Sequence, residues 1–364
     1  PLKLAMEFDK LDIVMLPYEE LEGMLSVTEP GKSILLDPKI TSAAVRSAIP
    51  DTVKVVEGIS RVAVRKSVKN PVELANLEKA MLKDGVALTR FLYWLENSLA
   101  DNHITELSAS AKLHTLRAEQ EDFVSPSFNT ITAWNSHSAL PHYTATPATD
   151  TTIGEKGIFL VDSGGHYRDG TTDITRTIAM GIPTARQKAD FTLVLKGLIA
   201  LSCARFPEKT RGIQLDILAR QALWKSGLNY GHGTGHGVGY CLNVHEGPQS
   251  ISPAQSGAGS SFFGQGMLTS NEPAVYREGE YGIRTENIMV CCEDEETEFG
   301  KFYRFETLSL CHIDTRLVDV ELLDQDEINW LNSYNNTVYE KLSVHLGQEE
   351  AMWLSVKTSP LIIS

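Results

Sequence analysis

Four acidic residues stand at the ends of apolar, strand-like runs. Asp162 ends one such run, and Asp173 opens the next run after a glycine-rich turn. A hairpin of this kind can bring two carboxylates side by side at the end of a sheet, although a lone Asp in a turn is more often only a turn residue. Glu272 ends a later apolar run, and Glu286 follows fourteen residues further on, beside Arg284. An arginine next to a carboxylate is often an ordinary surface pair.

Three histidines lie close together in a glycine-rich stretch. His232 and His236 are four residues apart, and His245 follows shortly after. Five glycines between residues 231 and 239 argue against a helix, so these histidines are not a helical metal pair. The glycines fit neither the dinucleotide pattern GxGxxG nor a phosphate-binding P-loop. We expect them to permit close backbone approach and to leave the imidazoles projecting into a shared space.

This set of side chains predicts bound cations. Four carboxylates gathered at strand ends would repel one another strongly without them. Oxygen-rich ligands with a single nitrogen suit Mn²⁺, Co²⁺ or Fe²⁺ better than a structural zinc site. Two bridging carboxylates would hold two ions about 3.5–4 Å apart. The sequence contains neither a GxSxG nucleophile elbow nor an HExxH zinc motif, which leaves metal-assisted hydrolysis as the favoured chemistry.

The elements that must position these residues follow from periodicity and capping patterns. Asn70 followed by Pro71 starts a helix over 71–97. Flanking helices and strand-like runs in the same part of the chain indicate an α+β catalytic domain. We expect further helices at 104–120, 184–205 and 213–226, and strands at 157–161, 173–180, 267–271 and 282–292. Before residue 66 we expect buried strands at 13–16 and 34–36 and a short helix at 42–49.

Composition excludes several classes of partner. The 364 residues carry 33 Lys and Arg against 47 Asp and Glu, a net charge of −14, which disfavours binding to nucleic acid. No apolar stretch is long enough for a membrane span. The five cysteines are scattered without a CxxC motif, which indicates a reducing compartment, and we expect a cytoplasmic protein.

Four segments carry a resemblance to a known family. The sequence resembles the long, three-domain, cytosolic aminopeptidase P type of the pita-bread metallopeptidases. The stretches that carry it are DSGGHYRDGTTDITRT, YGHGTGHGVGYCLNVHEGP, SNEPAVYREGEYGIRTEN and LPHY. The resemblance implies three regions: 1–66 as the end of an α/β creatinase N-terminal-like domain, 67–300 as the pita-bread catalytic domain, and 301–364 as a C-terminal extension packed on it. The long type has further sequence before the position that corresponds to residue 1.

The resemblance also implies roles for particular residues. It implies two divalent ions, with Mn²⁺ expected and Co²⁺, Zn²⁺ or Fe²⁺ as alternatives, bridged by Asp173 and Glu286. It makes His142, His232 and His245 substrate-binding residues, His142 and His245 with catalytic roles as well. Glu272 would be both ligand and proton shuttle, and Arg284 would orient a ligand carboxylate. The implied metal ligands are Asp162, Asp173, His236, Glu272 and Glu286.

The implied reaction is hydrolysis of the first peptide bond in peptides that have proline as the second residue. The implied assembly is a homodimer. Two other readings remain open: an Xaa-Pro dipeptidase of the prolidase type or a creatinase-like hydrolase without the metals, and a pita-bread binding module without catalysis. The intact ligand set disfavours the binding module, and the long sequence after Glu286 disfavours prolidase.

Overall fold

The computed structural model forms two compact units, residues 1–65 and 66–364. Every residue singled out above for chemistry lies in the second unit. Among the helices that the structure describes, none is both long and apolar enough to cross a membrane. The structure describes the whole chain except residues 1–7, 9, 12, 100–102, 255–260 and 363–364.

The first unit is small and buries few side chains. Its strands β1 (Ser33–Leu36) and β2 (Lys54–Glu57) form a parallel pair, with α3 (Ala43–Ser47) between them in sequence. The strand expected at 34–36 and the short helix are thus present, although the strand stays partly exposed. The buried strand expected at 13–16 is wrong: these residues are in no strand of the described chain, and their side chains are 47–80% exposed. The remaining elements are η1 (Tyr18–Glu20) and α2 (Leu21–Ser26), and α4 (Arg61–Ser67) runs across the boundary between the two units.

The helices expected in the second unit are confirmed. The helix that starts at Pro71 has the capping box that its sequence predicts. The Asn70 side chain accepts from the backbone N–H of Glu73, and the Glu73 carboxylate accepts from the backbone N–H of Asn70. Two more helices follow near the C-terminus. The helices are α5 (Pro71–Ser98), α6 (Glu106–Ala118), α7 (Ala185–Ser202), α8 (Gly212–Lys225), α9 (Gln325–Leu342) and α10 (Gln348–Lys357).

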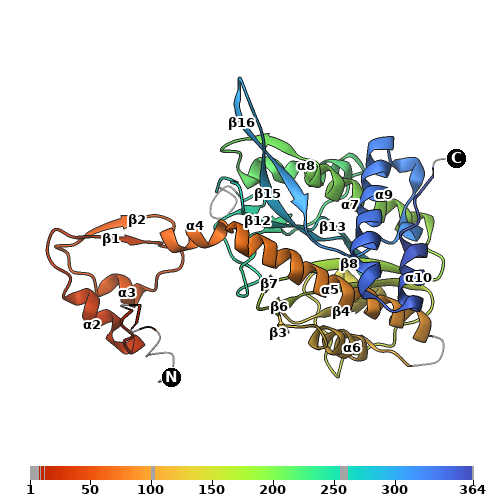
Figure 1. The fold of residues 1–364 in the computed structure, drawn as a ribbon, viewed down its shortest axis with the longest axis horizontal. Helices are drawn as coiled ribbons and strands as arrows, with labels where there is room; N and C mark the ends of the chain where they lie inside the picture. Colours follow the sequence, from red (N-terminus) through yellow and green to blue (C-terminus); the bar gives the residue numbers. More distant parts are fainter. Residues whose placement is uncertain (1–7, 9, 12, 100–102, 255–260, 363–364) are drawn as a thin grey trace. The chain divides into compact units, whose positions relative to one another are not determined.

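Antiparallel strands form the sheets around which these helices pack (Figure 1). One sheet has the order β4-β5-β8, a second the order β12-β15-β16-β9, and a third the order β3-β6-β7, while β13 pairs with β14 and β10 with β11. The strands are β3 (Phe123–Pro126), β4 (Ile131–Trp134), β5 (Gly157–Ser163), β6 (Gly165–Tyr167), β7 (Gly170–Thr171), β8 (Ile174–Met180), β9 (Arg205–Pro207), β10 (Gly235–His236), β11 (Ser250–Ile251), β12 (Leu268–Asn271), β13 (Ala274–Arg277), β14 (Tyr281–Arg284), β15 (Asn287–Thr297) and β16 (Gly300–Thr307).

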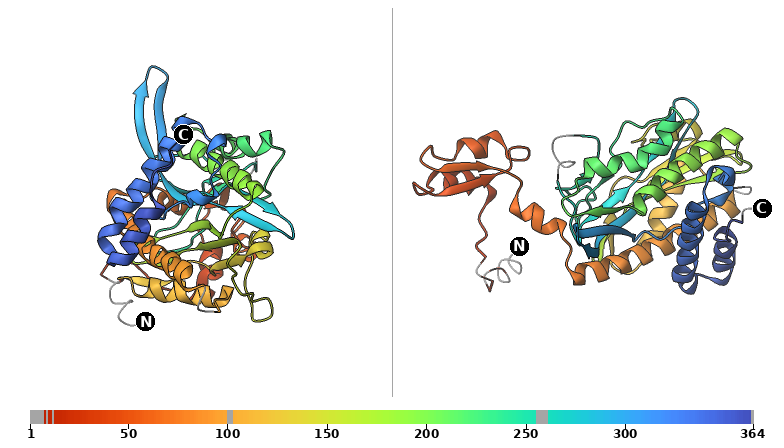
Figure 2. Two further views of the ribbon diagram at one scale, coloured as in Figure 1. Left: turned by 90° about the vertical axis from the view of Figure 1, so that its right-hand side faces the viewer. Right: turned by 90° about the horizontal axis from the view of Figure 1, so that it is seen from above.

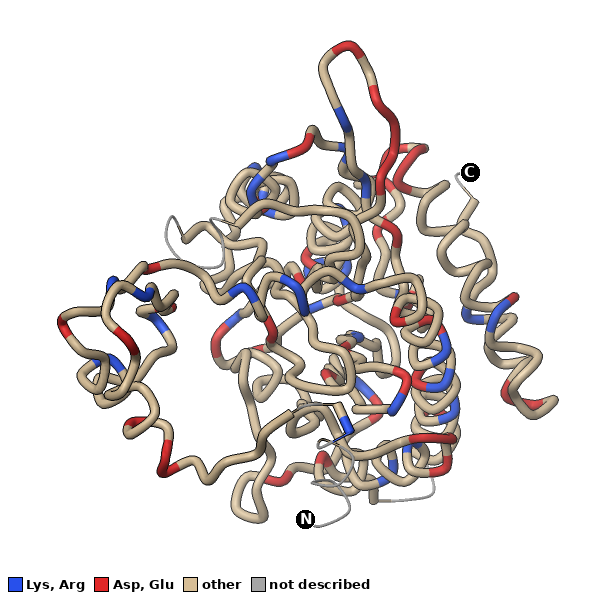
Figure 3. The backbone as a smooth tube through the Cα atoms, turned by 60° about the vertical axis from the view of Figure 1, so that its left-hand side comes forward, with Lys and Arg blue, Asp and Glu red and all other residues tan. Residues whose placement is uncertain are grey.

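The single strand expected over 282–292 is wrong in one respect. The chain leaves β14 after Arg284 and starts β15 at Asn287, so Thr285 and Glu286 lie between two strands that belong to different sheets. The reason is tertiary, because the Glu286 backbone N–H donates to the Thr175 carbonyl in β8. Beyond this break β15 and β16 form a long hairpin, in which five of the six residues 293–298 are acidic (Figure 3).

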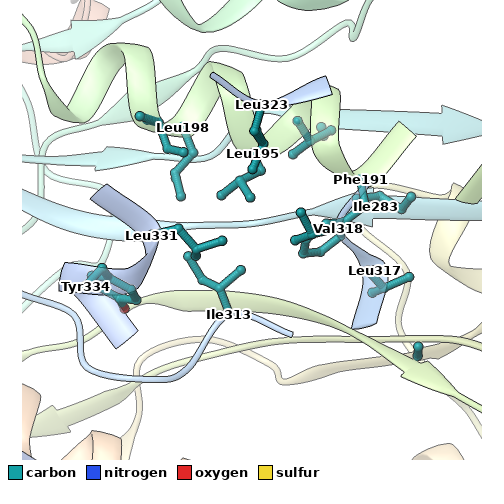
Figure 4. Close-up of a cluster of buried hydrophobic side chains, with 14 of the residues drawn as sticks. Phe191, Leu195, Leu198, Ile283, Ile313, Leu317, Val318, Leu323, Leu331 and Tyr334 are labelled. Atoms are coloured by element: carbon teal, nitrogen blue, oxygen red, sulfur yellow. The ribbon is translucent and has the colours of Figure 1, made fainter. Parts of the chain in front are cut away.

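The C-terminal helices complete the main core. Leu331 and Tyr334 of α9 lie in one buried cluster with Leu195 and Leu198 of α7 (Figure 4). Helices α9 and α10 lie side by side (Figure 2), and α10 also contacts α5. The 3-10 turns of this region are η4 (Thr315–Leu317), η5 (Val320–Leu322) and η6 (Ser343–His345).

A buried arginine joins this region to the sheets. Arg176 of β8 donates through Nη1 to the Glu286 carbonyl at 2.7 Å. Its Nη2 donates to the Cys311 carbonyl at 2.8 Å and to the Tyr334 hydroxyl at 2.7 Å. The Arg176 side chain therefore forms hydrogen bonds with both the backbone of Glu286 and the C-terminal region.

Candidate functional site

Asp162 and Asp173 come from one antiparallel strand pair. Asp162 lies in β5 opposite Thr175 of β8, and Asp173 precedes the first residue of β8. Both carboxylates are buried. The two strands expected from the sequence therefore pair, although β6 and β7 lie where only a turn was expected between them. The pairing brings the two carboxylates to one end of the sheet, where their oxygens lie within 4.8 Å of each other and of a Glu286 oxygen.

Glu272 and Glu286 come from the other side of the site. Glu272 follows β12 directly, and its backbone N–H donates to the Thr234 carbonyl at 2.8 Å. Glu286 lies between β14 and β15, where its Oε2 accepts from Thr175 Oγ1 at 2.8 Å. Thr175 thus fixes both the backbone and the carboxylate of Glu286, which explains why the strand breaks at this position.

His236 is held with one ring nitrogen turned toward the carboxylates. Its Nδ1 lies 3.0 Å from the Gly237 carbonyl, and since a carbonyl can only accept, Nδ1 carries the proton. Its Nε2 then lies 3.4 Å from Asp173 Oδ2 and 3.6 Å from Glu272 Oε1. A metal-ligating histidine typically shows this arrangement, with its other ring nitrogen donating to a carbonyl.

The position of His236 depends on the glycine before it. A Cβ on Gly235 would lie 2.0 Å from the Ser270 carbonyl oxygen, so no larger residue fits without a backbone shift. The same strand is fixed by its neighbour, because the His236 backbone N–H donates to Ser270 Oγ at 2.9 Å. Close backbone approach is what the glycine-rich stretch was expected to permit, and Gly235 confirms it.

The donor atoms fit a pair of cations. Two groups share Glu286, which is how two ions held by a common carboxylate would be arranged. Oδ1 of Asp162 is buried and has no hydrogen-bond partner among the described residues, as expected of an oxygen that serves a cation. Donor atoms within 4.8 Å of one another form the groups Asp162–Asp173–Glu286, His236–Glu272–Glu286 and Asp173–His236–His245.

Electrostatics point the same way. Burial, together with the neighbouring Asp162 and Glu272 carboxylates, raises the pKa of Asp173 well above its usual range. Burial and the charges of Asp173 and Asp162 likewise raise the pKa of Glu286. Burial and Glu286 raise the pKa of Glu272 to about 8. Carboxylates forced together in this way are stabilised in their charged form by bound cations.

Arg284 connects the carboxylates to the histidines through a residue that the sequence did not reveal. Its Nη2 donates to Asp162 Oδ2, and its Nη1 donates to the Tyr276 hydroxyl at 2.6 Å. The Tyr276 hydroxyl lies 2.9 Å from His232 Nε2. Because His232 Nδ1 faces the Gly233 carbonyl at 2.8 Å, Nε2 is the acceptor and Tyr276 the donor.

Tyr276 could have been found from the hairpin that carries it. Strands β13 and β14 pair Tyr276 with Gly282 and Ala274 with Arg284, so Tyr276 and Arg284 share one face. The turn glycine Gly279, with φ of +74°, was the available sequence cue for that register.

The predicted residues converge on one cavity of about 520 Å³. His142, His232 and His245 all line it, with His142 and His245 exposed and His232 half-buried. The ring of His245 lies with its centroid 4.2 Å from that of His236, closer to the donor cluster than a purely substrate-facing role requires. Burial lowers the pKa of His232 to about 4, which keeps that imidazole neutral. The other predicted residues that line the cavity are Asp162, Asp173, His236, Glu272, Arg284 and Glu286.

Comparison with known proteins finds relatives over most of the chain. Xaa-Pro aminopeptidase 1 of Dictyostelium discoideum is 39% identical over 361 residues, covering 96% of this chain and 57% of that protein. The crystal structure of an X-prolyl aminopeptidase from Caenorhabditis elegans, described as a cytosolic enzyme with a di-nuclear active site, matches with a TM-score of 0.92 and 37% identity. That match covers 99% of this chain and 60% of the other, so the chain spans little more than half the length of these relatives.

A more distant structure shares the fold alone. Prolidase from Pyrococcus furiosus matches with a TM-score of 0.63 and 23% identity, covering 82% of this chain and 81% of that one.

The model of metallopeptidase family M24 matches residues 75–293, and the model of the C-terminal region of peptidase M24 matches residues 301–361. The α+β, pita-bread fold expected from the sequence is confirmed. The chain therefore belongs to metallopeptidase family M24.

Proposed function

We propose that this chain is the catalytic part of an Xaa-Pro aminopeptidase, which hydrolyses the first peptide bond of peptides with proline second. The observation that carries the proposal is the single cavity in which five candidate ligands, three histidines and Arg284 converge. The similarity to Xaa-Pro aminopeptidases over 96% of the chain supports the choice of substrate.

The metal ligands in this proposal are the five residues expected from the sequence. Asp162 and Asp173 would hold one ion with Glu286, and His236 and Glu272 would hold the other, with Asp173 and Glu286 shared between them. A donor set of carboxylates with one imidazole favours Mn²⁺, with Co²⁺, Zn²⁺ and Fe²⁺ as alternatives. When bound, two such ions polarise a carbonyl oxygen and lower the pKa of water toward neutrality.

The chain's own residues orient the reactants around this centre. Glu272 is the proposed proton shuttle, since its Oε1 accepts only from Ser270 Oγ at 3.2 Å among the described groups. His142 and His245 contact the substrate near the scissile bond. His232 is neutral and therefore places no positive charge beside the substrate. Arg284 holds Asp162 in position and leaves Asp162 Oδ1 for the ion.

Selection for proline follows from shape. The bond before a proline is a tertiary amide without an N–H, so the ring itself must be recognised. Phe128, Ile131 and Pro141 supply apolar surface in the same cavity as the ligands. A compact, rigid apolar ring fits such a wall better than a flexible polar side chain.

Cleavage of defined peptides tests the proposal. The chain, loaded with Mn²⁺, is incubated with an Xaa-Pro-Xaa tripeptide, a matched Xaa-Ala-Xaa tripeptide and the dipeptide Gly-Pro, and the products are identified by mass. We expect release of the first residue from the Xaa-Pro-Xaa peptide alone, and loss of that activity on chelation or in Asp173→Asn. Cleavage of Gly-Pro only would identify a dipeptidase of the prolidase type, and no cleavage with two ions bound would favour a binding module.

The setting of the protein is also part of the proposal. We propose a cytoplasmic homodimer, on the basis of the family resemblance and of the Caenorhabditis elegans neighbour described as cytosolic. We propose that residues 1–66 are the end of a creatinase N-terminal-like domain and that residues 301–364 extend a catalytic domain formed by 67–300. Light scattering on the purified chain tests the dimer, with a 40.1 kDa mass indicating a monomer.

A further inference from the structure

A fully buried carboxylate lies outside the ligand cluster. Glu106 is 0% exposed, and it occupies the first position of α6, where the helix dipole favours a negative charge. It accepts from the Trp134 backbone N–H at 2.7 Å, from His137 Nδ1 at 2.9 Å and from the Tyr143 hydroxyl at 2.7 Å. A buried carboxylate with three donors has its hydrogen-bonding capacity satisfied, although apolar packing would often be as stable. We therefore ask which part of the chain the three donors hold in place.

The three donors flank a segment of two turns that contributes to the lining of the cavity. Between them the chain forms two successive turns, in which the Leu140 N–H donates to the His137 carbonyl and the Tyr143 N–H donates to the Leu140 carbonyl. His142 lies in the second of these turns and lines the cavity. Glu106 thus forms hydrogen bonds with both ends of the segment, with His137 at its start and with Tyr143 immediately after His142.

The start of this segment has anchors of its own. Asn135 Oδ1 accepts from the Ile158 N–H of β5 at 2.9 Å, and Ser138 Oγ accepts from the Gly282 N–H of β14 at 2.7 Å. A Cβ on Gly282 would lie 1.9 Å from the Ser138 carbonyl oxygen, which shows how closely the backbones meet. The 3-10 turn η2 (Asn135–Ala139) is therefore fixed without Tyr143.

The end of the segment depends on Tyr143. Its ring stacks on His137 with centroids 4.5 Å apart, and its hydroxyl has Glu106 as its closest partner, with Thr149 at 3.3–3.4 Å. Burial raises the pKa of Tyr143 to about 12, so the hydroxyl stays protonated and donates. His142 itself is exposed, and its backbone is held in place from the residue that follows it.

We propose that Glu106 and Tyr143 are positioning residues that set the orientation of His142 toward the substrate. This inference rests on the proposed function, in which His142 contacts the peptide near the scissile bond. Misplacing a substrate-contacting group by a fraction of an ångström lowers turnover while leaving the fold and the donor cluster in place.

A double-mutant comparison tests the proposal. We expect Tyr143→Phe to lower kcat/KM for an Xaa-Pro-Xaa peptide on the order of tenfold, with two ions still bound and the protein still folded at the assay temperature. In a His142→Ala background the same substitution should have no further effect. The matched control is Tyr93→Phe, which removes another tyrosine hydroxyl that donates to a glutamate, at 3.0 Å from Glu349 Oε2 and away from the cavity. An equal loss from Tyr143→Phe in both backgrounds, or no loss in either, overturns the proposal.

A spectroscopic measurement tests the same proposal without peptide cleavage. In protein with ¹³C-labelled histidine, the His142 ring signal is the one that disappears in His142→Ala. We expect this signal to shift or broaden in Tyr143→Phe and in Glu106→Gln but not in Tyr93→Phe. If the parent chain cleaves no Xaa-Pro peptide, the proposed function fails while this measurement still decides the positioning role. An unchanged His142 signal in both variants refutes it.

Discussion

A continuous hydrogen-bonded chain links the carboxylates to the imidazoles at the scale of single residues. It runs from Asp162 through Arg284 and Tyr276 to His232. Each group has its donor and acceptor roles set by the next, because the arginine can only donate and His232 Nδ1 is committed to the Gly233 carbonyl. The orientation of His232, which is proposed to face the substrate, is thereby tied to that of a candidate metal ligand.

Removal of one hydroxyl should interrupt this chain. We expect Tyr276→Phe to lower kcat/KM about tenfold, because His232 loses its donor and one Arg284 nitrogen its acceptor. Metal content should remain at the parent level, since Tyr276 is not among the candidate ligands. Steady-state kinetics with metal analysis checks both statements. A variant that has lost an ion would mean that the effect passes through Arg284 and Asp162 instead.

His236 and His245 lie next to each other and should nevertheless behave differently. We expect His236→Ala to lose bound Mn²⁺, because its Nε2 faces Asp173 and Glu272. His245→Ala should keep both ions and lose most of kcat/KM. Elemental analysis after dialysis separates the two. Equal depletion in both variants would place His245 among the ligands, as the third donor group allows.

At the scale of elements, the site exists because short strands meet with almost no space between them. Strand β10 contacts β12 so closely that Gly235 has no room for a Cβ beside the Ser270 carbonyl. The neighbouring Gly231 belongs to the same stretch, yet a Cβ there would meet no atom within 4 Å. Close packing therefore requires glycine at position 235 but not at position 231.

This contrast provides a matched pair of substitutions. Gly235→Ala should displace His236 and lower the affinity for Mn²⁺ by at least tenfold, because a contact of 2.0 Å cannot be relieved without moving backbone. Gly231→Ala should bind Mn²⁺ as the parent does. Calorimetric titration of both variants measures the difference. If both variants bind alike, the packing of β10 does not control the ligand.

Local sequence predicted the elements whose causes are local. The start of α5 is fixed by Asn70 and Glu73 within four residues, so it could be predicted to the residue. The break at Thr285 and Glu286 could not, because it is caused by Thr175 in a distant strand. An apolar run such as 13–16 was equally ambiguous, since only a packing partner makes such a run a buried strand.

The site shows the same division. The five candidate ligands follow from motifs in the sequence, and the structure brings their donor atoms together. Tyr276 was missed because its role depends on hairpin register, and Glu106 because its partners lie 28 to 37 residues further along the chain. A buried glutamate at the start of a helix looks, in sequence alone, like an ordinary first-turn acid.

At the scale of the whole second unit, the C-terminal region contributes buried side chains to the interior. His312 is buried with its ring edge-on to Trp353, at a centroid distance of 5.2 Å. Burial lowers its pKa to about 4 from 6.5, with Lys357, Arg176 and Arg316 also lowering the pKa and Asp314 opposing them. The folded protein therefore holds His312 neutral at pH values where an unfolded chain would protonate it.

This difference should make the folded protein less stable as the pH falls. Because the folded pKa is depressed, the unfolded state binds more protons below pH 6.5, and the free energy of unfolding declines as pH falls from 6.5 toward 4. Between pH 7 and 5 we expect His312 to account for a loss of about 2 kcal/mol. Denaturation at both pH values should show a smaller loss in His312→Gln, and an unchanged loss in His345→Gln on the surface. Parallel losses in the parent and in His312→Gln would exclude His312 as the cause.

The hydrogen bonds of Arg176 also set an order in time. A chain made from its N-terminus presents all five candidate ligands before Cys311 and Tyr334 leave the ribosome. Until then, the guanidinium that holds the Glu286 carbonyl lacks the partners that keep it buried, and α7 lacks the leucines of α9. We therefore expect a growing chain to remain unable to capture its ions, and to acquire them only after α9 and α10 have been released and have docked.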